Sequence, residues 1–317
     1  MYQLVSGNLR LRHLLVIVGL LYSELGFPAD TISELGPWEW LLGSRDQLSR
    51  QISSLGHNLD EWLAGEGVGE QVNETYLSVR LNQVAGSFDG YNSKLKIGGR
   101  LDLPRVSDRW KLIFESDVEE LNSLEENVLD DAQSSASIGG FRYQNVTDSG
   151  WEISHDFGLQ ARLPADPFYR MRLAYGADIG NLWSLAIRQK IWHYDSRGWG
   201  YDTEFSFIKE LAADRIFSYT TEFNFEDADN ITEFGQTLTL HQTLGAMETL
   251  SYELGFLGQN RPNLRVDDYY TRVLYRKAVF ENWLIFEVAP QIIVSREENW
   301  RPQPRLMVNL EVLFFDF

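Results

Sequence analysis

Basic residues recur at spacings of two and four in several segments of the chain. Side chains two or four positions apart lie on the same face of an extended strand, so each pair would present its charges together. Arginine and lysine side chains that converge in this way bind carboxylates and phosphates. The candidate binding residues are Arg170, Arg172, Arg188, Lys190, Arg272 and Arg276.

The histidines offer little support for catalysis. His155 lies between Ser154 and Asp156, but neighbouring residues of a strand point to opposite faces, so these three do not form a triad. His193 and Asp195 form a short pattern similar to the His–Asp pair of omptin-like proteases. Because the chain has no paired His spacing and no phosphate-binding Gly motif, we expect no catalytic residue, no metal and no cofactor.

The elements that must position these residues are strands, because the chain alternates with a period of two from residue 73 onward. In 217–225 aromatic residues and one Thr alternate with Ser, Thr, Glu and Asn, and the same pattern recurs in 201–207 and 250–256. A soluble antiparallel sandwich also alternates. Charges of both signs on the polar face, aromatic residues near the strand ends and segments of about ten residues favour a transmembrane β-barrel.

We predict an all-β fold, an antiparallel up-and-down barrel of about fourteen strands. Twelve strands are the alternative, because the connections at 147–150, 163–167 and 178–181 are short and one of them could be a bend. An even number places both ends of the barrel on the periplasmic side. The predicted strands are residues 73–86, 93–103, 109–117, 135–146, 151–162, 168–177, 182–194, 200–209, 215–226, 231–243, 249–258, 267–278, 282–294 and 304–317.

The segment before the barrel divides into two predicted parts. Residues 1–29 have the basic, apolar and small-residue regions of a secretory signal peptide. We expect residues 30–72 to form a periplasmic segment with an amphipathic helix at 44–63, whose apolar residues recur mainly at spacings of three and four. The apolar stripe of this helix would face the barrel mouth, the membrane surface or a periplasmic partner. The barrel itself covers residues 73–317.

The longest predicted loop, 117–134, is rich in Asp and Glu and contains no base. We expect a solvated extracellular loop, because a run of like charges favours exposure to water. The alternative is a loop that folds into the barrel lumen.

The chain ends in Leu-Phe-Phe-Asp-Phe, with Phe315 two residues before Phe317. This ending resembles the C-terminal strand signal of bacterial outer-membrane β-barrels. The resemblance implies contact with membrane lipid, insertion by the barrel-assembly machinery through this strand, and location in the outer membrane of a Gram-negative bacterium. Because Phe315 and Phe317 share a face with Glu311, we expect the strand to change phase or bend before its end.

Charge and composition narrow the function. The formal net charge of −18 excludes nucleic acid as a partner, since phosphates would repel the chain. If the apolar rows face lipid, the inward rows carry modestly more bases than acids, so we expect a narrow channel for small anionic solutes. One alternative is a structural or interaction barrel with a plugged lumen and a periplasmic docking helix. The other is a barrel hydrolase.

Overall fold

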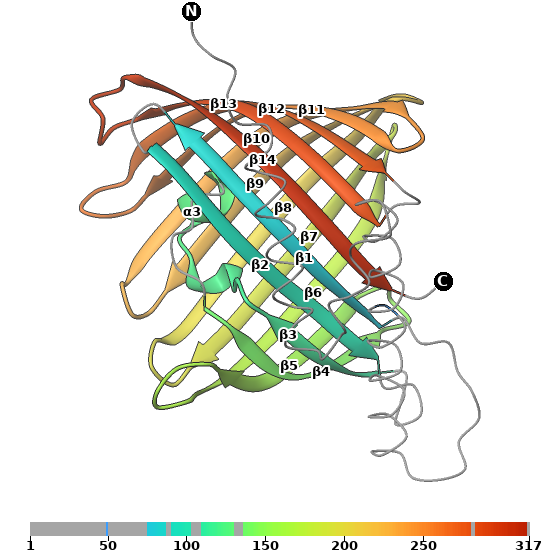
Figure 1. Cartoon of the computed structure of the whole chain (residues 1–317), viewed down its shortest axis with the longest axis vertical. Helices are drawn as coiled ribbons and strands as arrows, with labels where there is room; N and C mark the ends of the chain where they lie inside the picture. The colour runs from blue at the N-terminus through green and yellow to red at the C-terminus, as the bar shows by residue number, and fades with distance from the viewer. Residues whose placement is uncertain are drawn as a thin grey trace, which may run out of the picture. The chain divides into compact units, whose positions relative to one another are not determined.

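The computed structural model describes residues 75–86, 90–102, 109–129, 136–279 and 283–315, together with Ser49. The described residues form fourteen antiparallel strands in a closed barrel, in which neighbours along the chain pair and β1 closes against β14 (Figure 1). This confirms the predicted up-and-down barrel, with fourteen strands rather than twelve. The predicted signal peptide at 1–29 and, apart from Ser49, the predicted helix at 44–63 lie outside the described residues.

The observed strands fall in the predicted segments, with bounds that differ by a few residues. They are β1 (Tyr76–Gly86), β2 (Gly90–Asp102), β3 (Trp110–Glu115), β4 (Ile138–Val146), β5 (Glu152–Gln160), β6 (Asp166–Gly180), β7 (Trp183–Tyr194), β8 (Gly198–Ala212), β9 (Arg215–Glu226), β10 (Ile231–Gly245), β11 (Glu248–Gln259), β12 (Arg265–Val279), β13 (Leu284–Ser295) and β14 (Pro302–Phe315). A 3₁₀ turn, η2 (Glu119–Leu121), and a short helix, α3 (Leu124–Leu129), lie between β3 and β4. No helix among the described residues is long and apolar enough to cross a bilayer.

The short connections that left the strand count open are true chain reversals. Asn181 and Leu182 join β6 to β7, and both have positive φ, 53° and 63°. A two-residue turn with positive φ at both positions matches the twist of a hairpin. Between β4 and β5 the Thr147 amide donates to the Trp151 carbonyl at 2.8 Å, and Gly150 supplies a φ of 83°. Each turn therefore ends one strand and starts the next.

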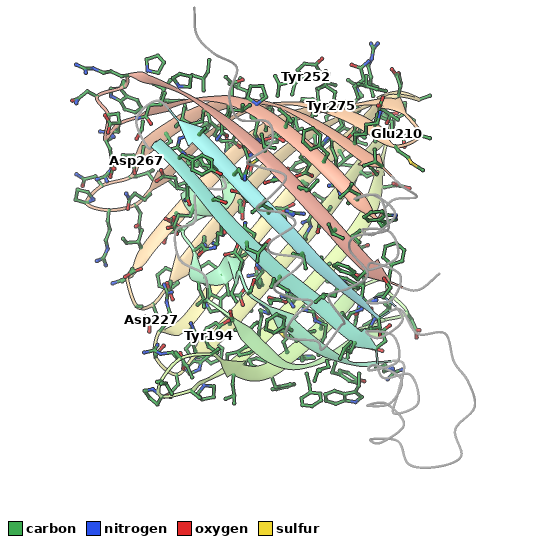
Figure 2. The ribbon with its side chains drawn as sticks, in the orientation of Figure 1. Tyr194, Glu210, Asp227, Tyr252, Asp267 and Tyr275 are labelled. Carbon is green, nitrogen blue, oxygen red and sulfur yellow. The ribbon has the colours of Figure 1, made fainter. Side chains whose placement is uncertain are left out.

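The two ends of the barrel differ in their connections. At the end where β1 begins and β14 ends, β6–β7, β8–β9 and β10–β11 are joined by two residues each, whereas 161–165, 260–264 and 296–301 at the other end are longer. Short turns mark the periplasmic side of outer-membrane barrels. We call the end with the longer connections the outer end; Asp227 and Asp267 lie there, and Glu210 lies at the opposite end (Figure 2).

The outward-facing rows of the strands are apolar. Large side chains on these rows remain widely exposed, including Phe157, Phe223 and Leu254 at 46%, 40% and 58% of their surface. Aromatic side chains also stack across strands, as Tyr201 does on Phe225 at 5.2 Å between ring centres. An apolar surface of this extent is unfavourable in water. It is suited to contact with lipid chains.

The last strand keeps its phase. The pairing of β1 with β14 runs from Gly86 opposite Arg305 to Tyr76 opposite Phe315 without a shift of register. The phase change that we predicted near the end of the chain is therefore wrong as far as Phe315. Because alternation continues, Phe315 stays on the row of Glu311, and Phe317 lies outside the described residues.

Candidate functional site: the barrel lumen

The connection from β3 to β4 turns into the lumen. We call residues 116–129 the inner loop. It leaves β3 through Ser116, whose amide donates to the Ile97 carbonyl at 2.8 Å and whose hydroxyl accepts from the Ile97 amide at 2.6 Å. The expected solvated extracellular loop at 117–134 is therefore wrong for its described part, and the alternative of a loop folded into the lumen holds. Residues 130–135 lie outside the described residues.

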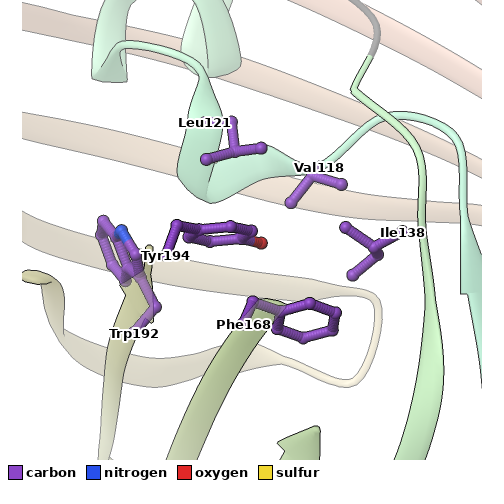
Figure 3. Close-up of a cluster of buried hydrophobic side chains, with 6 residues drawn as sticks. All are labelled: Val118, Leu121, Ile138, Phe168, Trp192 and Tyr194. Carbon is purple, nitrogen blue, oxygen red and sulfur yellow. The ribbon is translucent and has the colours of Figure 1, made fainter. Parts of the chain in front are cut away.

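Apolar residues explain why so acidic a segment turns inward. Val118 and Leu121 are 1% and 7% exposed and pack on side chains from the strand wall (Figure 3). Their partners are Ile138, Phe168, Trp192 and Tyr194. Burial of one aliphatic side chain contributes about 1.5–3 kcal/mol. This contribution favours docking of the inner loop in the lumen, provided that basic residues or hydrogen-bond donors neutralise the carboxylates of the loop.

The second half of the inner loop packs on the far wall of the barrel. Leu124 and Leu129 of α3 are almost completely buried. They contact Leu257, Tyr270 and Ile293 from β11, β12 and β13. The N-terminus of α3 is closed by a capping box, in which the Glu126 amide donates to the Ser123 hydroxyl at 3.1 Å and the Ser123 amide donates to the Glu126 carboxylate at 2.9 Å.

Two polar contacts show that the inner loop crosses the whole lumen. The Leu124 amide donates to Glu233 of β10 at 2.8 Å, and Arg272 of β12 donates to the Val128 carbonyl at 3.0 Å. In a closed ring of fourteen strands, β10 is seven strands from β3 in either direction. The segment therefore spans the barrel from one side to the opposite side.

A completely buried arginine holds the middle of the inner loop. The guanidinium of Arg170 on β6 donates to Glu115 at 2.8 Å, to Glu120 at 2.5 Å and to Asp156 at 2.8 Å. Glu120 also accepts the Tyr194 hydroxyl at 3.0 Å. We call Arg170 and these three carboxylates the arginine clamp. Several planar donors and several carboxylates satisfy one another here away from water.

Two carboxylates of the inner loop, Glu120 and Asp117, are held in their charged form. Burial alone would raise the pKa of Glu120, but the nearby positive charges, led by Arg170, lower it to about 2. Asp117 lies 2.7 Å from both Lys94 and Lys96. Burial opposes ionisation there too, and the two lysines outweigh it, so the pKa of Asp117 falls below its ordinary value. Charge therefore anchors the loop at neutral pH.

The six residues predicted from the sequence lie on inward rows, but they do different things. Arg170 and Arg272 hold the inner loop, and Arg272 also donates to Glu253 at 2.9 Å. Arg172 pairs with Asp156 beside the clamp, and Lys190 lies 3.3 Å from Glu119 of the inner loop. Four of the six thus belong to the anchoring of the loop.

The remaining two predicted residues are more open to water. The side chain of Arg188 is 67% exposed and lies 3.4 Å from Glu204. The side chain of Arg276 is 47% exposed and lies 3.2 Å from Glu287. Sequence reasoning placed these bases on the correct face but did not identify their carboxylate partners.

A cavity of about 770 Å³ lies between the inner loop and the strand wall. Eight carboxylates and four bases line it among the described residues, and three of these carboxylates belong to the inner loop. The four bases are Arg80, Lys96, Arg188 and Arg272. The expected basic excess is therefore not found at this cavity. The inner loop adds acids, and the clamp buries Arg170 so that it does not line the cavity.

The two histidines weighed for catalysis lie on outward rows. His155 hydrogen-bonds the Tyr169 hydroxyl at 2.9 Å, and the ring of His193 packs edge-on against Trp199 at 4.8 Å. Their neighbours Asp156 and Tyr194 point inward to the clamp.

The closed ring of strands, the apolar outer rows and the charged lumen together decide the class of protein. The chain is an outer-membrane β-barrel. It is located in the outer membrane of a Gram-negative bacterium, where its outward rows contact lipid.

The comparisons with known proteins found similarity among solved structures. No protein-family model and no curated protein matches the sequence. Among solved structures, a loop-deletion mutant of OmpT, an outer membrane protein of Vibrio cholerae, is 9% identical over 76% of this chain and 99% of that chain, with a TM-score of 0.47. OprB of Pseudomonas putida is 12% identical over 82% and 96%, with a TM-score of 0.45. The outer membrane channel DcaP of Acinetobacter baumannii is 8% identical over 77% and 96%, with a TM-score of 0.44. At these identities the likeness concerns the fold alone.

Proposed function

We propose that this barrel is a narrow channel for small hydrophilic solutes and that its lumen prefers cations. The observation that carries the proposal is the 770 Å³ cavity between the inner loop and the wall, with twice as many carboxylates as bases in its lining. The inner loop narrows the passage, and the charges around it select what passes. The outward position of His155 and His193 supports transport over hydrolysis.

The bases that line the cavity are already compensated. Arg80 lies 2.8 Å from Glu311, Lys96 lies 2.7 Å from Asp117, and Arg272 and Arg188 pair with Glu253 and Glu204. Of the four remaining carboxylates, Glu115, Glu119 and Glu287 contact Arg170, Lys190 and Arg276, which do not line the cavity, and Glu126 contacts no base in the described part of the chain. The charge of Glu126 leaves the space negative. Clefts lined by one sign of charge concentrate ions of the opposite sign. The preference for anions that the inward rows of the strands suggested is thus replaced by a preference for cations.

Single-channel recording tests the proposal directly. The purified full-length chain would be inserted into planar bilayers that separate two KCl solutions of different concentration. We expect small, discrete conductance steps and a reversal potential of the sign that K⁺ permeation gives. Detergent without protein is the control. A reversal potential of the opposite sign, or no conductance above that control, overturns the proposal.

A plugged barrel is the second candidate, because the inner loop is anchored on both sides of the lumen. Its role would then be structural, and the segment at 44–63 would bind a periplasmic partner. A protein without conductance whose co-purifying proteins change when residues 40–66 are deleted would favour this candidate.

A further inference from the structure

A second, smaller cavity opens beside the inner loop at the outer end of the barrel. We call this cavity of about 200 Å³ the outer recess. Its lining brings together five carboxylates and one base among the described residues. They are Glu120, Glu126, Glu226, Asp229, Glu233 and Arg197.

Two of the five carboxylates are already neutralised. Glu120 belongs to the arginine clamp, and Glu226 accepts a hydrogen bond from Arg197 at 2.5 Å. Glu126 and Glu233 each accept one backbone amide, and Asp229 is exposed. Within the described part of the chain, no base pairs with these last three. The recess therefore keeps an uncompensated negative charge.

A mostly buried asparagine in the same recess has a side-chain amide without a protein partner among the described residues. Asn224 lies on β9 between Asp202 of β8 and Glu233 of β10, and it is 6% exposed. It lines the recess, and its side-chain amide forms no hydrogen bond with the residues that the structure describes. The amide atoms are therefore open to whatever fills the recess, either water or a solute. An occupant that donates to the Asn224 carbonyl oxygen would satisfy this acceptor.

The recess also adjoins the lumen. Glu126 lines both the outer recess and the 770 Å³ cavity. A solute held in the recess thus lies next to the carboxylate that separates the recess from the channel interior.

We propose that the outer recess binds a small organic cation through its ammonium groups, before the cation enters the lumen. This inference deepens the proposed channel function and rests on it for the second step. Among the described residues no group of three or more His, Asp or Glu is arranged to hold a metal ion. Separate acceptors fit an ammonium group better, because it carries three donors that can reach several oxygens. Asn224, Asp229 and Glu233 supply these acceptors.

Calorimetric titration of the detergent-solubilised full chain tests the binding step. The probe is putrescine, and the controls are butanediol and succinate, which have the same number of carbons but are neutral and anionic. We expect heat of binding with putrescine and none above dilution with the two controls. Binding of succinate, or no binding of putrescine, overturns the proposal.

A matched pair of variants locates the site. Asp227 and Asp229 stand two residues apart in the β9–β10 connection, and of these two Asp229 lines the recess. We expect Asp229→Asn to weaken putrescine binding about two- to fivefold, as for an exposed ion pair, and Asp227→Asn to leave it unchanged. Equal effects of the two variants would show that putrescine is attracted to the acidic surface in general, and they would contradict a binding site in the outer recess.

Asn224→Leu tests the buried amide, and we expect binding to weaken about tenfold, because a hydrogen bond to a charged group is lost. Heat-modifiable gel mobility checks that each variant is folded, and Asp229→Asn keeps the test valid if Asn224→Leu does not fold. Conductance in KCl without putrescine binding would contradict the proposed binding site in the outer recess, but the proposed channel function would stand. Putrescine binding to a barrel without conductance would contradict the proposed channel function and the entry of the cation into the lumen. The outer recess would then remain as a binding site.

Discussion

The two sides of the lumen use the same residue types for different purposes. On the side of β3 to β6, Arg170 is completely buried among Glu115, Glu120 and Asp156. On the side of β8 and β9, Glu204 stands directly opposite Glu222, so that two carboxyl groups face each other across the strand pair. Two ionised carboxylates in this position would be destabilising unless water or a cation separated them. The comparison shows that contact with the inner loop, rather than spacing in the sequence, distinguishes the charges that anchor the loop from those that line the open cavity. Under the proposed function, the second group selects the solute.

Removal of the clamp arginine should have the largest effect. Arg170→Met leaves three carboxylates near one another without their central cation, and we expect unfolding free energy to fall by about 3–5 kcal/mol. The inner loop should leave the lumen, so single-channel conductance should rise. Urea unfolding followed by tryptophan fluorescence, together with bilayer recording, measures both. Arg276→Met is the control, because that side chain is half exposed. Lower stability with unchanged conductance would show that Arg170 does not hold the inner loop in the lumen, and it would contradict the distinction between the anchoring side and the open side.

Acidification should release the loop in a defined window. The pKa of Glu120 is lowered from 4.5 to about 2, which corresponds to roughly 3 kcal/mol. A lowered carboxyl pKa stabilises the folded form above the ordinary pKa, and this contribution disappears as the pH falls toward the folded value. Conductance should therefore stay constant from neutral pH to about 4.5 and rise below it. Glu120→Gln, which mimics the protonated form, should show the higher conductance already at pH 7.

The acidic side of the lumen should control selectivity more than stability. Glu204→Gln removes one charge from the cavity lining without changing its shape. We expect the ratio of K⁺ to Cl⁻ permeability to fall about twofold, the equivalent of ~0.4 kcal/mol. Reversal potentials in a KCl gradient measure this ratio. Glu210→Gln is the matched control, since Glu210 lies at the end of the barrel opposite the outer end and does not line the cavity (Figure 2).

The smallest effect is expected at Arg188, which faces the cavity with most of its side chain exposed. Arg188→Gln should change the free energy of unfolding by less than about 0.5 kcal/mol. The cation preference should increase slightly, because Glu204 loses its partner. Loss of stability as large as that of Arg170→Met would show that the open side of the lumen also anchors the barrel.

The strands and their inward rows could be predicted because alternation has a period of two, and a slip of one residue would turn every apolar side chain inward. The partners across neighbouring strands could not be predicted from alternation alone, because the register also depends on the turns; Arg142, Asp156 and Arg170 lie opposite one another on β4, β5 and β6. The inner loop could not be placed from alternation either, because its partners lie far along the chain. The sequence feature that indicates its inward position is a set of four apolar residues that recur every three to five positions among the acids, Val118, Leu121, Leu124 and Leu129.

The crossing of the lumen by the inner loop has a consequence for the order of folding. Its contact with Glu233 joins residues 109 positions apart, and its contact with Arg272 joins residues 144 positions apart. Contacts between such distant residues form late, because the intervening chain must first be ordered. The segment at 116–129 therefore has no far wall to bind until β10 to β13 are in place. A partly assembled barrel would have a wider lumen than the complete one, because this segment would not yet be docked. Docking of the segment would follow closure of the ring.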